Sequence, residues 1–98
     1  MVKVKLSGKF DANYKELISS DSELESVIWD RIVIFHNKSS DTRLHNHKLK
    51  GKLKGKWAFS ITDDIRIVYE WKTKNVVRFL AIGRHEKVYR REIKHIVK

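Results

Sequence analysis

Hydrophobic positions recur at helical spacing in the first part of the chain. Residues 2–6, VKVKL, alternate and predict a strand, but the apolar residues that follow return every three or four positions. This spacing predicts a short helix over 10–19 and a longer helix over about 22–38. Ser22 and Glu25 have the spacing of a capping box, which predicts the start of the second helix.

The hydrophobic period changes to two in the second part of the chain. Three runs, at 57–61, 65–71 and 76–82, alternate or are continuously apolar, and the breaks TDD and KTKN between them have turn chemistry. The pattern predicts a three-stranded antiparallel meander, with the N-terminal strand joining its sheet. After Gly83 we expect a short final helix.

These elements predict a single α+β domain over residues 1–98, with two helices packed on one face of the sheet. The helices should cover the odd-numbered residues of the first two meander strands, because side chains alternate between the faces of a strand. The even-numbered face, which carries Ser60 and Arg66, would then be open to solvent.

Composition excludes several kinds of site. The chain has no cysteine, so it can form no disulfide, thiolate metal site or cysteine nucleophile. Its apolar runs are far too short to span a bilayer, and the N-terminus lacks the apolar region of a signal peptide. We therefore expect an unexported, cytoplasmic protein without a membrane partner.

The whole chain has a formal net charge of +10, and the positive charge is concentrated in its second part. Residues 1–42 hold 6 Lys or Arg and 7 Asp or Glu, whereas residues 43–98 hold 16 and 5. Such asymmetry favours a polyanionic partner, usually a nucleic acid. A lysine-rich surface selected for solubility is the alternative, but that explanation would fit an even spread of lysine better.

Lysine alternates with other residues in the most basic stretch, HNHKLKGKLKGKW at 45–57. One interpretation is a solvated edge strand or loop that lysine protects against aggregation. The other is a strip that follows phosphates, in which the glycines permit close approach of the backbone. The candidate substrate contacts in this stretch are Lys48, Lys50, Lys52, Lys54 and Lys56.

Three residues beyond this stretch could carry chemistry. Arg66 is either a surface arginine paired with an acid such as Asp64 or a bidentate clamp for phosphate. His85 is either a partly buried, hydrogen-bonded histidine or a general acid or base. Tyr89 could stack on a nucleic-acid base or close the edge of the core.

The remaining histidines suggest no metal site. His45 and His47 form an H-x-H pair, which on a strand would place both rings on one face and suit zinc. No carboxylate or cysteine lies close to them in the sequence, so we predict neither a metal nor another cofactor. His36 and His95 are expected to be ordinary residues on helix surfaces.

Two runs, HKLKGKLKGKWAFSITDDIRIVYEW and VRFLAIGRHEKVY, carry a family resemblance. They contain an H-x-L-x-G lead-in, G-x-W before a strand, I-T-D-D-x-R-I-V-Y, and a G-x-H-x-x-x-Y ending. In these features the chain resembles the RelE/ParE toxin superfamily, especially its YoeB-like and YafQ-like ribonuclease branches. Size and element order fit along the whole chain, which implies a small RelE-like fold.

The resemblance implies a type II toxin that cuts messenger RNA in the ribosomal A site without a metal. In that reaction the 2′-hydroxyl attacks the adjacent phosphate, which requires a base, an acid and cations around the phosphorane. By their positions in the motifs, His47 would be the general base, Arg66 would bind the scissile phosphate and His85 would be the general acid. Tyr89 would help to position the substrate.

Other positions both match and depart from these branches. Asp64 matches an aspartate of the YafQ-like branch, and we expect it and Arg84 to contact the substrate. The YafQ-like branch has an aspartate and a histidine where this chain has Ala58 and Ser60. The YoeB-like branch has basic residues at the positions of Phe59 and Ser60.

The resemblance also implies partners. We expect an acidic antitoxin that wraps around the toxin in a hetero-oligomer, and messenger RNA on the ribosome, with contacts to 16S rRNA. Two alternatives remain open: a ParE-like toxin that acts on DNA gyrase, and a basic nucleic-acid-binding module without catalysis. The ionisable residues expected on one face of the sheet favour the ribonuclease.

Overall fold

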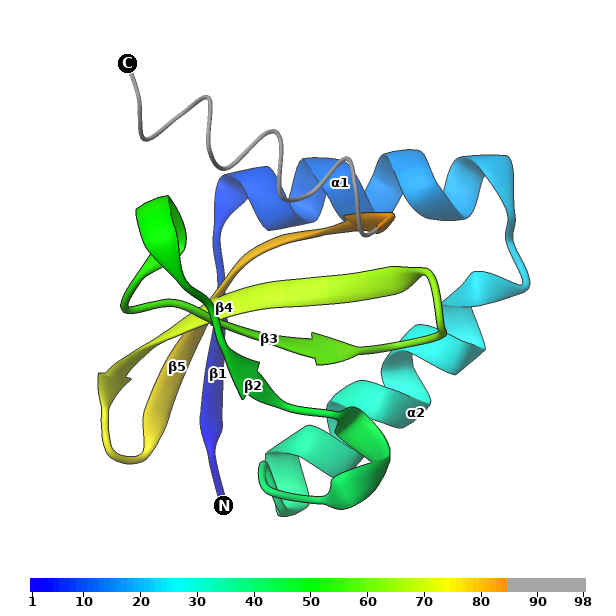
Figure 1. Ribbon diagram of the computed structural model, residues 1–98. Coiled ribbons are helices and arrows are strands. Elements are labelled where there is room, and N and C mark those ends of the chain that lie inside the picture. The colour runs from blue at the N-terminus through cyan, green and yellow to red at the C-terminus, as the bar shows by residue number, and fades with distance from the viewer. Residues whose placement is uncertain (85–98) are drawn as a thin grey trace.

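The computed structural model describes residues 1–84, so the predicted final helix, His85, Tyr89 and His95 lie outside the described residues. In chain order the elements, with η marking a 3-10 helix, are β1 (Lys3–Leu6), α1 (Gly8–Ser20), α2 (Leu24–Asn37), η1 (Thr42–Leu44), β2 (His47–Lys48), η2 (Gly51–Leu53), β3 (Trp57–Ser60), β4 (Ile65–Thr73) and β5 (Val76–Arg84) (Figure 1).

The strands form one mixed sheet in the order β1-β5-β4-β3-β2. The antiparallel pairing of β3, β4 and β5 confirms the predicted meander. The N-terminal strand joins the sheet as predicted, and it runs parallel to β5, with Lys3 opposite Val76. The short β2, which the pattern had not separated from the lysine stretch, forms the other edge by antiparallel pairing with β3.

A side-chain cap places the start of α1 two residues earlier than the pattern predicted. The Ser7 hydroxyl accepts a hydrogen bond from the backbone N–H of Phe10 at 2.9 Å, which satisfies one of the free donors of the first turn. The same hydroxyl donates to the carbonyl of Leu80 at 3.1 Å. Ser7 therefore fixes the beginning of α1 to β5.

The predicted capping box at the start of α2 is wrong. Glu23 occupies the cap position and makes no side-chain cap bond, and the helix begins at Leu24. The carboxylate of Glu25 accepts a hydrogen bond from the hydroxyl of Tyr14 at 3.1 Å. This tertiary contact holds Glu25 toward α1, which explains why it does not reach back to the backbone of Ser22.

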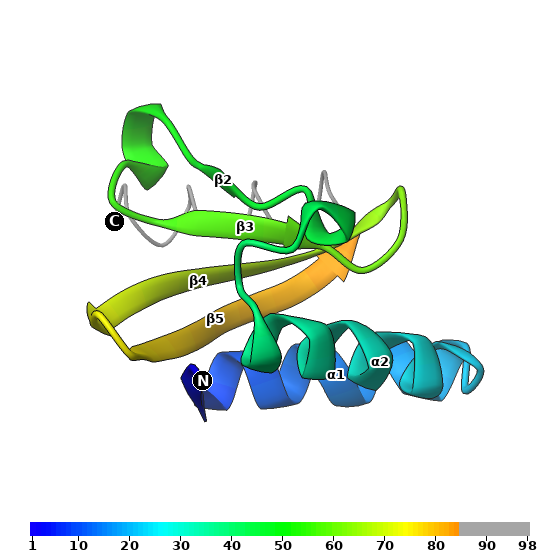
Figure 2. The ribbon, with the colours of Figure 1, turned by 90° about the horizontal axis from the view of Figure 1, so that it is seen from below.

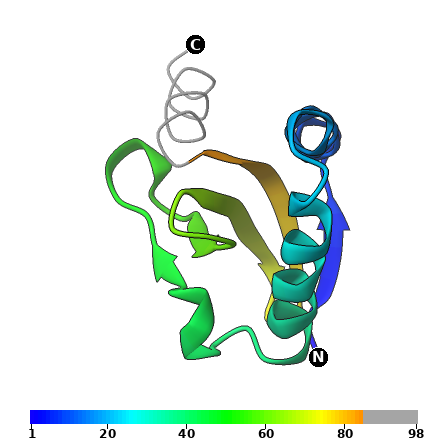
Figure 3. The same cartoon turned by 90° about the vertical axis from the view of Figure 1, so that its right-hand side faces the viewer.

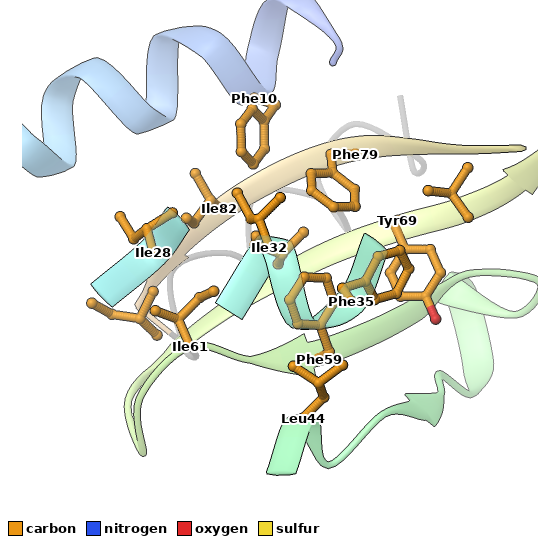
Figure 4. Close-up of a cluster of buried hydrophobic side chains, with 13 residues drawn as sticks. Phe10, Ile28, Ile32, Phe35, Leu44, Phe59, Ile61, Tyr69, Phe79 and Ile82 are labelled. Atoms are coloured by element: carbon orange, nitrogen blue, oxygen red, sulfur yellow. The ribbon is translucent and has the colours of Figure 1, made fainter. Parts of the chain in front are cut away.

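Both helices lie in one layer against one face of the sheet, as predicted (Figure 2). Four odd-numbered residues of β3 and β4 are buried in the core against this layer, namely Phe59, Ile65, Ile67 and Tyr69, and Trp57 and Trp71 are partly buried beside them. Phe35 of α2 stacks on Phe59, with ring centroids 4.6 Å apart, and meets Tyr69 edge-on at 4.9 Å (Figure 4). These aromatic pairs fix α2 against the centre of the sheet.

The opposite face of the sheet is less open than the alternation predicted. Val68 and Ala81 are buried there, and they pack against the half-buried Leu49 and Leu80. Leu49 comes from the segment between β2 and η2, which folds back over the sheet. The middle of this face is therefore covered, whereas Arg66 at one end and Glu70, Lys72 and Arg78 toward the other end remain accessible.

His36 is not the ordinary surface residue that was expected. It is half-buried, its Nδ1 lies 2.6 Å from the carbonyl oxygen of Val2, and its own carbonyl accepts a bond from the N–H of Val2 at 3.0 Å. These contacts tie the end of α2 to the start of β1. Neither of the two α-helices described within residues 1–84 is long and apolar enough to cross a membrane.

Candidate functional site

The pairing of three strands places His47 and Arg66 on the same face of the sheet. His47 lies opposite Ala58 across β2 and β3, and Ser60 lies opposite Arg66 across β3 and β4. Directly paired residues point to the same face, as do residues two apart on one strand. With strands about 4.8 Å apart and a rise of about 3.4 Å per residue, the two Cα atoms are roughly 12 Å apart, which the two side chains can span.

His47 and Arg66 line one pocket of about 420 Å³, which we call the cationic pocket. The connection from α2 through η1 to β2 leads from the helical layer to the sheet edge (Figure 3). It brings Arg31 of α2 and Arg43 of η1 to the same pocket. Among residues 1–84 the lining consists of Arg31, Arg43, His45, His47, Ser60, Ile61, Thr62, Asp63 and Arg66.

The ring of His47 is exposed and oriented by its own backbone. Its Nδ1 lies 2.9 Å from the carbonyl oxygen of His45, a contact that requires a proton on Nδ1. In the neutral ring the lone pair is then on Nε2, which is the nitrogen left free to accept a proton. His45 itself has φ of 49°, a left-handed conformation that turns the chain from η1 toward β2.

Arg66 is half-buried and held by backbone carbonyls instead of an acid. Its Nη1 donates to the carbonyl of Thr62 at 2.6 Å and lies 3.3 Å from that of Ile65. The alternative in which Arg66 pairs with Asp64 is wrong, because Asp64 binds Arg84. Within residues 1–84 no carboxylate pairs with the guanidinium of Arg66, and its hydrogen bonds to these residues use Nη1 alone.

Asp64 and Arg84 bind each other at the pocket's margin. Nη1 of Arg84 is 2.6 Å from Oδ2 of Asp64, and both side chains are about half exposed. Neither residue belongs to the lining of the cationic pocket. The pair joins the turn after β3 to the end of β5, and its expected contact with substrate stays a prediction.

Two arginines of the cationic pocket were missed in the sequence. The guanidinium of Arg43 is bound by both oxygens of Asp41, at 3.0 and 2.9 Å. The hydrogen bonds from Arg43 hold the pKa of the Asp41 carboxyl well below its usual range. Nη1 of Arg31 donates to the carbonyl of Arg43 at 3.1 Å. The one feature of the sequence that could have drawn attention to Arg31 is that it is the only arginine among residues 1–42.

The lysine stretch is not the continuous strip that the alternation suggested. It consists of the two-residue β2, the short η2 and two glycines with positive φ, Gly51 at 64° and Gly55 at 92°. A second pocket, of about 620 Å³, lies within this turn, with Leu49 and Trp57 among its lining and Lys48, Lys50, Lys54 and Lys56 around them. Lys52 is exposed outside it.

Some of these lysines already have partners. The ammonium of Lys48 lies 5.4 Å from the ring centre of Trp57, a cation–π contact. Lys56 approaches Glu70 at 3.9 Å, and Glu70 also binds Lys72 at 3.0 Å. In the part of the chain that the structure describes, no three His, Asp or Glu side chains are placed together to hold a metal ion.

Comparisons with solved structures support this fold. The chain is similar to a copper-bound point mutant of a toxin from Helicobacter pylori, with 27% identity, a TM-score of 0.75, and coverage of 90% of this chain and 99% of that one. It is also similar to YafQ from Escherichia coli, with 18% identity, a TM-score of 0.75, and coverage of 91% and 99%. The E. coli DinJ–YafQ toxin–antitoxin complex gives 19% identity, a TM-score of 0.73, and coverage of 90% and 97%.

The sequence identifies the family more narrowly. A comparison with curated proteins found no match. The sequence model of a family described as the bacterial toxin of type II toxin–antitoxin system, YafQ, matches residues 2–90. Fold and family match together place the chain among the RelE/ParE-like toxins of type II toxin–antitoxin systems. Within that class the chain belongs to the YafQ toxin family.

Proposed function

We propose that this toxin is a ribosome-dependent endoribonuclease that cleaves messenger RNA by attack of a 2′-hydroxyl on the adjacent phosphate. The observation that carries the proposal is the cationic pocket, which His47 and Arg66 both line and in which, among residues 1–84, no carboxylate pairs with Arg66. A base and a fixed cation beside one phosphate are two of the three components that this reaction requires, and the third is an acid for the leaving oxygen.

His47 acts as the general base. Its Nδ1–H donates to the carbonyl of His45, so the lone pair of the neutral ring is on Nε2, and His47 lines the pocket. In this orientation Nε2 can take the proton of the 2′-hydroxyl as the oxygen attacks phosphorus. The reaction forms a cyclic 2′,3′-phosphate and releases the 5′-oxygen of the next nucleotide, which needs a proton from an acid.

Arg66 stabilises the charge that develops on the phosphorane. Its Nη1 is fixed by the carbonyl of Thr62, which leaves the other guanidinium nitrogens for the phosphate oxygens. Preorganised donors of this kind typically contribute about 100-fold to 1,000-fold in rate. His85 supplies the proton to the leaving oxygen and Tyr89 positions the substrate in this proposal, and both assignments rest on the sequence motif alone.

The rest of the proposal concerns partners. The lysines around the second pocket contact the phosphates of messenger RNA or 16S rRNA, and the excess positive charge favours an acidic antitoxin. A toxin that acts on ribosomes works in the cytoplasm. The toxin and its antitoxin then form a hetero-oligomer in which the antitoxin neutralises part of the basic surface.

The test is to express the chain from a tightly controlled promoter in bacteria and to map the 5′ ends of RNA. The variants are His47→Gln and Arg66→Ala, and the matched control is Arg78→Ala, which removes an exposed arginine that does not line the cationic pocket. We expect cuts within translated messages for the wild type and the control, and about 100-fold fewer cuts for both site variants.

Other outcomes would redirect the proposal. Growth arrest with intact RNA would favour a target such as DNA gyrase. Cleavage that persists in both site variants would mean that the cationic pocket is not the active site. A wild type that neither arrests growth nor cuts RNA would leave a binding protein without catalysis.

A further inference from the structure

A second guanidinium without a carboxylate partner lies on the helical side of the cationic pocket. Arg31 is half-buried on α2, and its Nη1 donates to the backbone carbonyl of Arg43 at 3.1 Å. Within residues 1–84 no aspartate or glutamate forms an ion pair with Arg31. Like Arg66, it is anchored by a carbonyl through one nitrogen and keeps its charge.

Arg43 differs from these two arginines. Asp41 binds its guanidinium through both oxygens, so the pair carries no net charge although Arg43 lines the pocket. Asp63 is the one carboxylate in the described lining. Among residues 1–84, the arginines of the lining that form no ion pair are therefore Arg31 on the helical layer and Arg66 on the sheet.

Binding of one phosphate requires only one of these two guanidinium groups. A single scissile phosphate bound by Arg66 would leave Arg31 half-buried and unpaired, which is an unfavourable arrangement for a charged group. A polyanion with regularly spaced charges satisfies both arginines at once. The two arginines lie on different elements, each anchored by a backbone carbonyl, so the distance between them is set by the fold.

We propose that Arg31 binds the phosphate next to the scissile one, so that the cationic pocket holds two successive phosphates of single-stranded RNA. The inference rests on the proposed function for the identity of the polyanion. The guanidinium suits this role because its fork of donors matches two phosphate oxygens, and carbonyl anchoring keeps it in place before the substrate arrives.

The test measures binding without cleavage. The ligand is a fluorescent single-stranded RNA in which a 2′-deoxy sugar at the cleavage position removes the attacking hydroxyl. Matched ligands replace one phosphate at a time, on either side of that position, by an uncharged methylphosphonate. Binding to the full chain is measured by anisotropy for the wild type, Arg31→Ala, Arg31→Lys and the matched control Arg78→Ala.

We expect Arg31→Ala to weaken binding of the fully charged RNA by about tenfold, the order expected for a lost charge-assisted hydrogen bond. The defect should disappear with one methylphosphonate ligand, because a thermodynamic cycle shows coupling only between groups that interact. Arg31→Lys should recover part of the affinity, and Arg78→Ala should show no coupling to any single phosphate. On β5, Gly83 pairs with Arg66 of the pocket, and Arg78 lies five residues before Gly83. Arg78 is therefore roughly 17 Å along the strand from the pocket.

Two results would overturn the inference: equal binding by Arg31→Ala and the wild type, or a defect of the same size with every methylphosphonate ligand. Thermal melting of Arg31→Ala shows whether lost binding follows from a loosened η1. Arg31→Gln removes the charge and keeps a polar amide at this position. The coupling between Arg31 and one phosphate would stand even if the chain proved unable to cut RNA, so the two proposals can fail separately.

Discussion

Replacing Tyr69 by phenylalanine should loosen the segment that carries His47. Tyr69 is fully buried in the core, and its hydroxyl donates to Oδ1 of Asn46 at 2.7 Å. The Nδ2 of Asn46 in turn donates to the carbonyl of Ser39 at 3.0 Å. This chain of bonds ties the loop before β2 to the centre of the sheet, one residue from the proposed base.

The structure sets the size of the effect. The change to phenylalanine keeps the ring and its aromatic contacts, so only the hydrogen bond is lost, which costs about 1 kcal/mol when the orphaned partner is half-buried. For a domain of this length that corresponds to a fall of about 5 °C in Tm. RNA cleavage should fall severalfold at a temperature where the variant is folded, because small misplacement of a reacting group is costly.

The assay compares calorimetric Tm and cleavage for Tyr69→Phe and for the control Tyr14→Phe. Tyr14 also loses a hydroxyl, but its bonds to Glu25 and Trp29 lie at the surface, so we expect a change below about 0.5 kcal/mol. A double variant with Asn46→Ala should cost little more than Asn46→Ala alone, which already removes the bond to Tyr69 together with the bond to Ser39. If Tyr69→Phe melts like the wild type and cleaves RNA equally well, the reasoning is refuted.

The same residue gives a dependence on pH. Burial raises the pKa of Tyr69 to about 12, above the value near 10 of an exposed tyrosine, and the bond to Asn46 opposes this only partly. A raised pKa contributes stability that is complete below pH 10 and is lost as pH rises from about 10 to about 12. Lysines titrate in the same pH window, so their effect has to be subtracted. The measured quantity is the difference in the free energy of unfolding between the wild type and Tyr69→Phe, and this difference should narrow as pH rises from about 10 to about 12.

Three further predictions concern the fold and the pocket. Ser7→Ala removes the cap of α1 and should lower the free energy of unfolding by about 1 to 2 kcal/mol in a urea titration, and an unchanged midpoint would contradict the capping role. Asp41→Asn frees the guanidinium of Arg43, so the RNA affinity measured by anisotropy should rise severalfold at low salt, whereas a loss would mean that the pair shapes the pocket. Gly55→Ala forces a side chain into φ of 92° and should lower the free energy of unfolding by about 1 kcal/mol. Gly8→Ala on α1, where a Cβ meets nothing within 4 Å, should be neutral or stabilising. Equal changes in Tm for the two variants would contradict the role of backbone conformation at Gly55.

The periodicity of the sequence was sufficient for the fold class. Strands and helices were predicted because the apolar period changes from 3.6 to 2, and the odd-numbered residues Phe59, Ile65, Ile67 and Tyr69 are buried as that period requires. Local reasoning failed where a tertiary contact competes with a local bond. Glu25 binds Tyr14 instead of capping α2, and Ser7 gains from Leu80 a partner that no local pattern contains.

The candidate site divides in the same way. His47 and Arg66 were predicted from motif positions and strand parity, because alternation along a strand is a local property. Asp64 and Arg84 were also expected to be functional, but only the fold shows that they neutralise each other. The sequence therefore determined which residues could carry chemistry. Tertiary structure decided which cations stay unpaired at the pocket, because pairing depends on side chains such as Arg31 that long-range packing brings together.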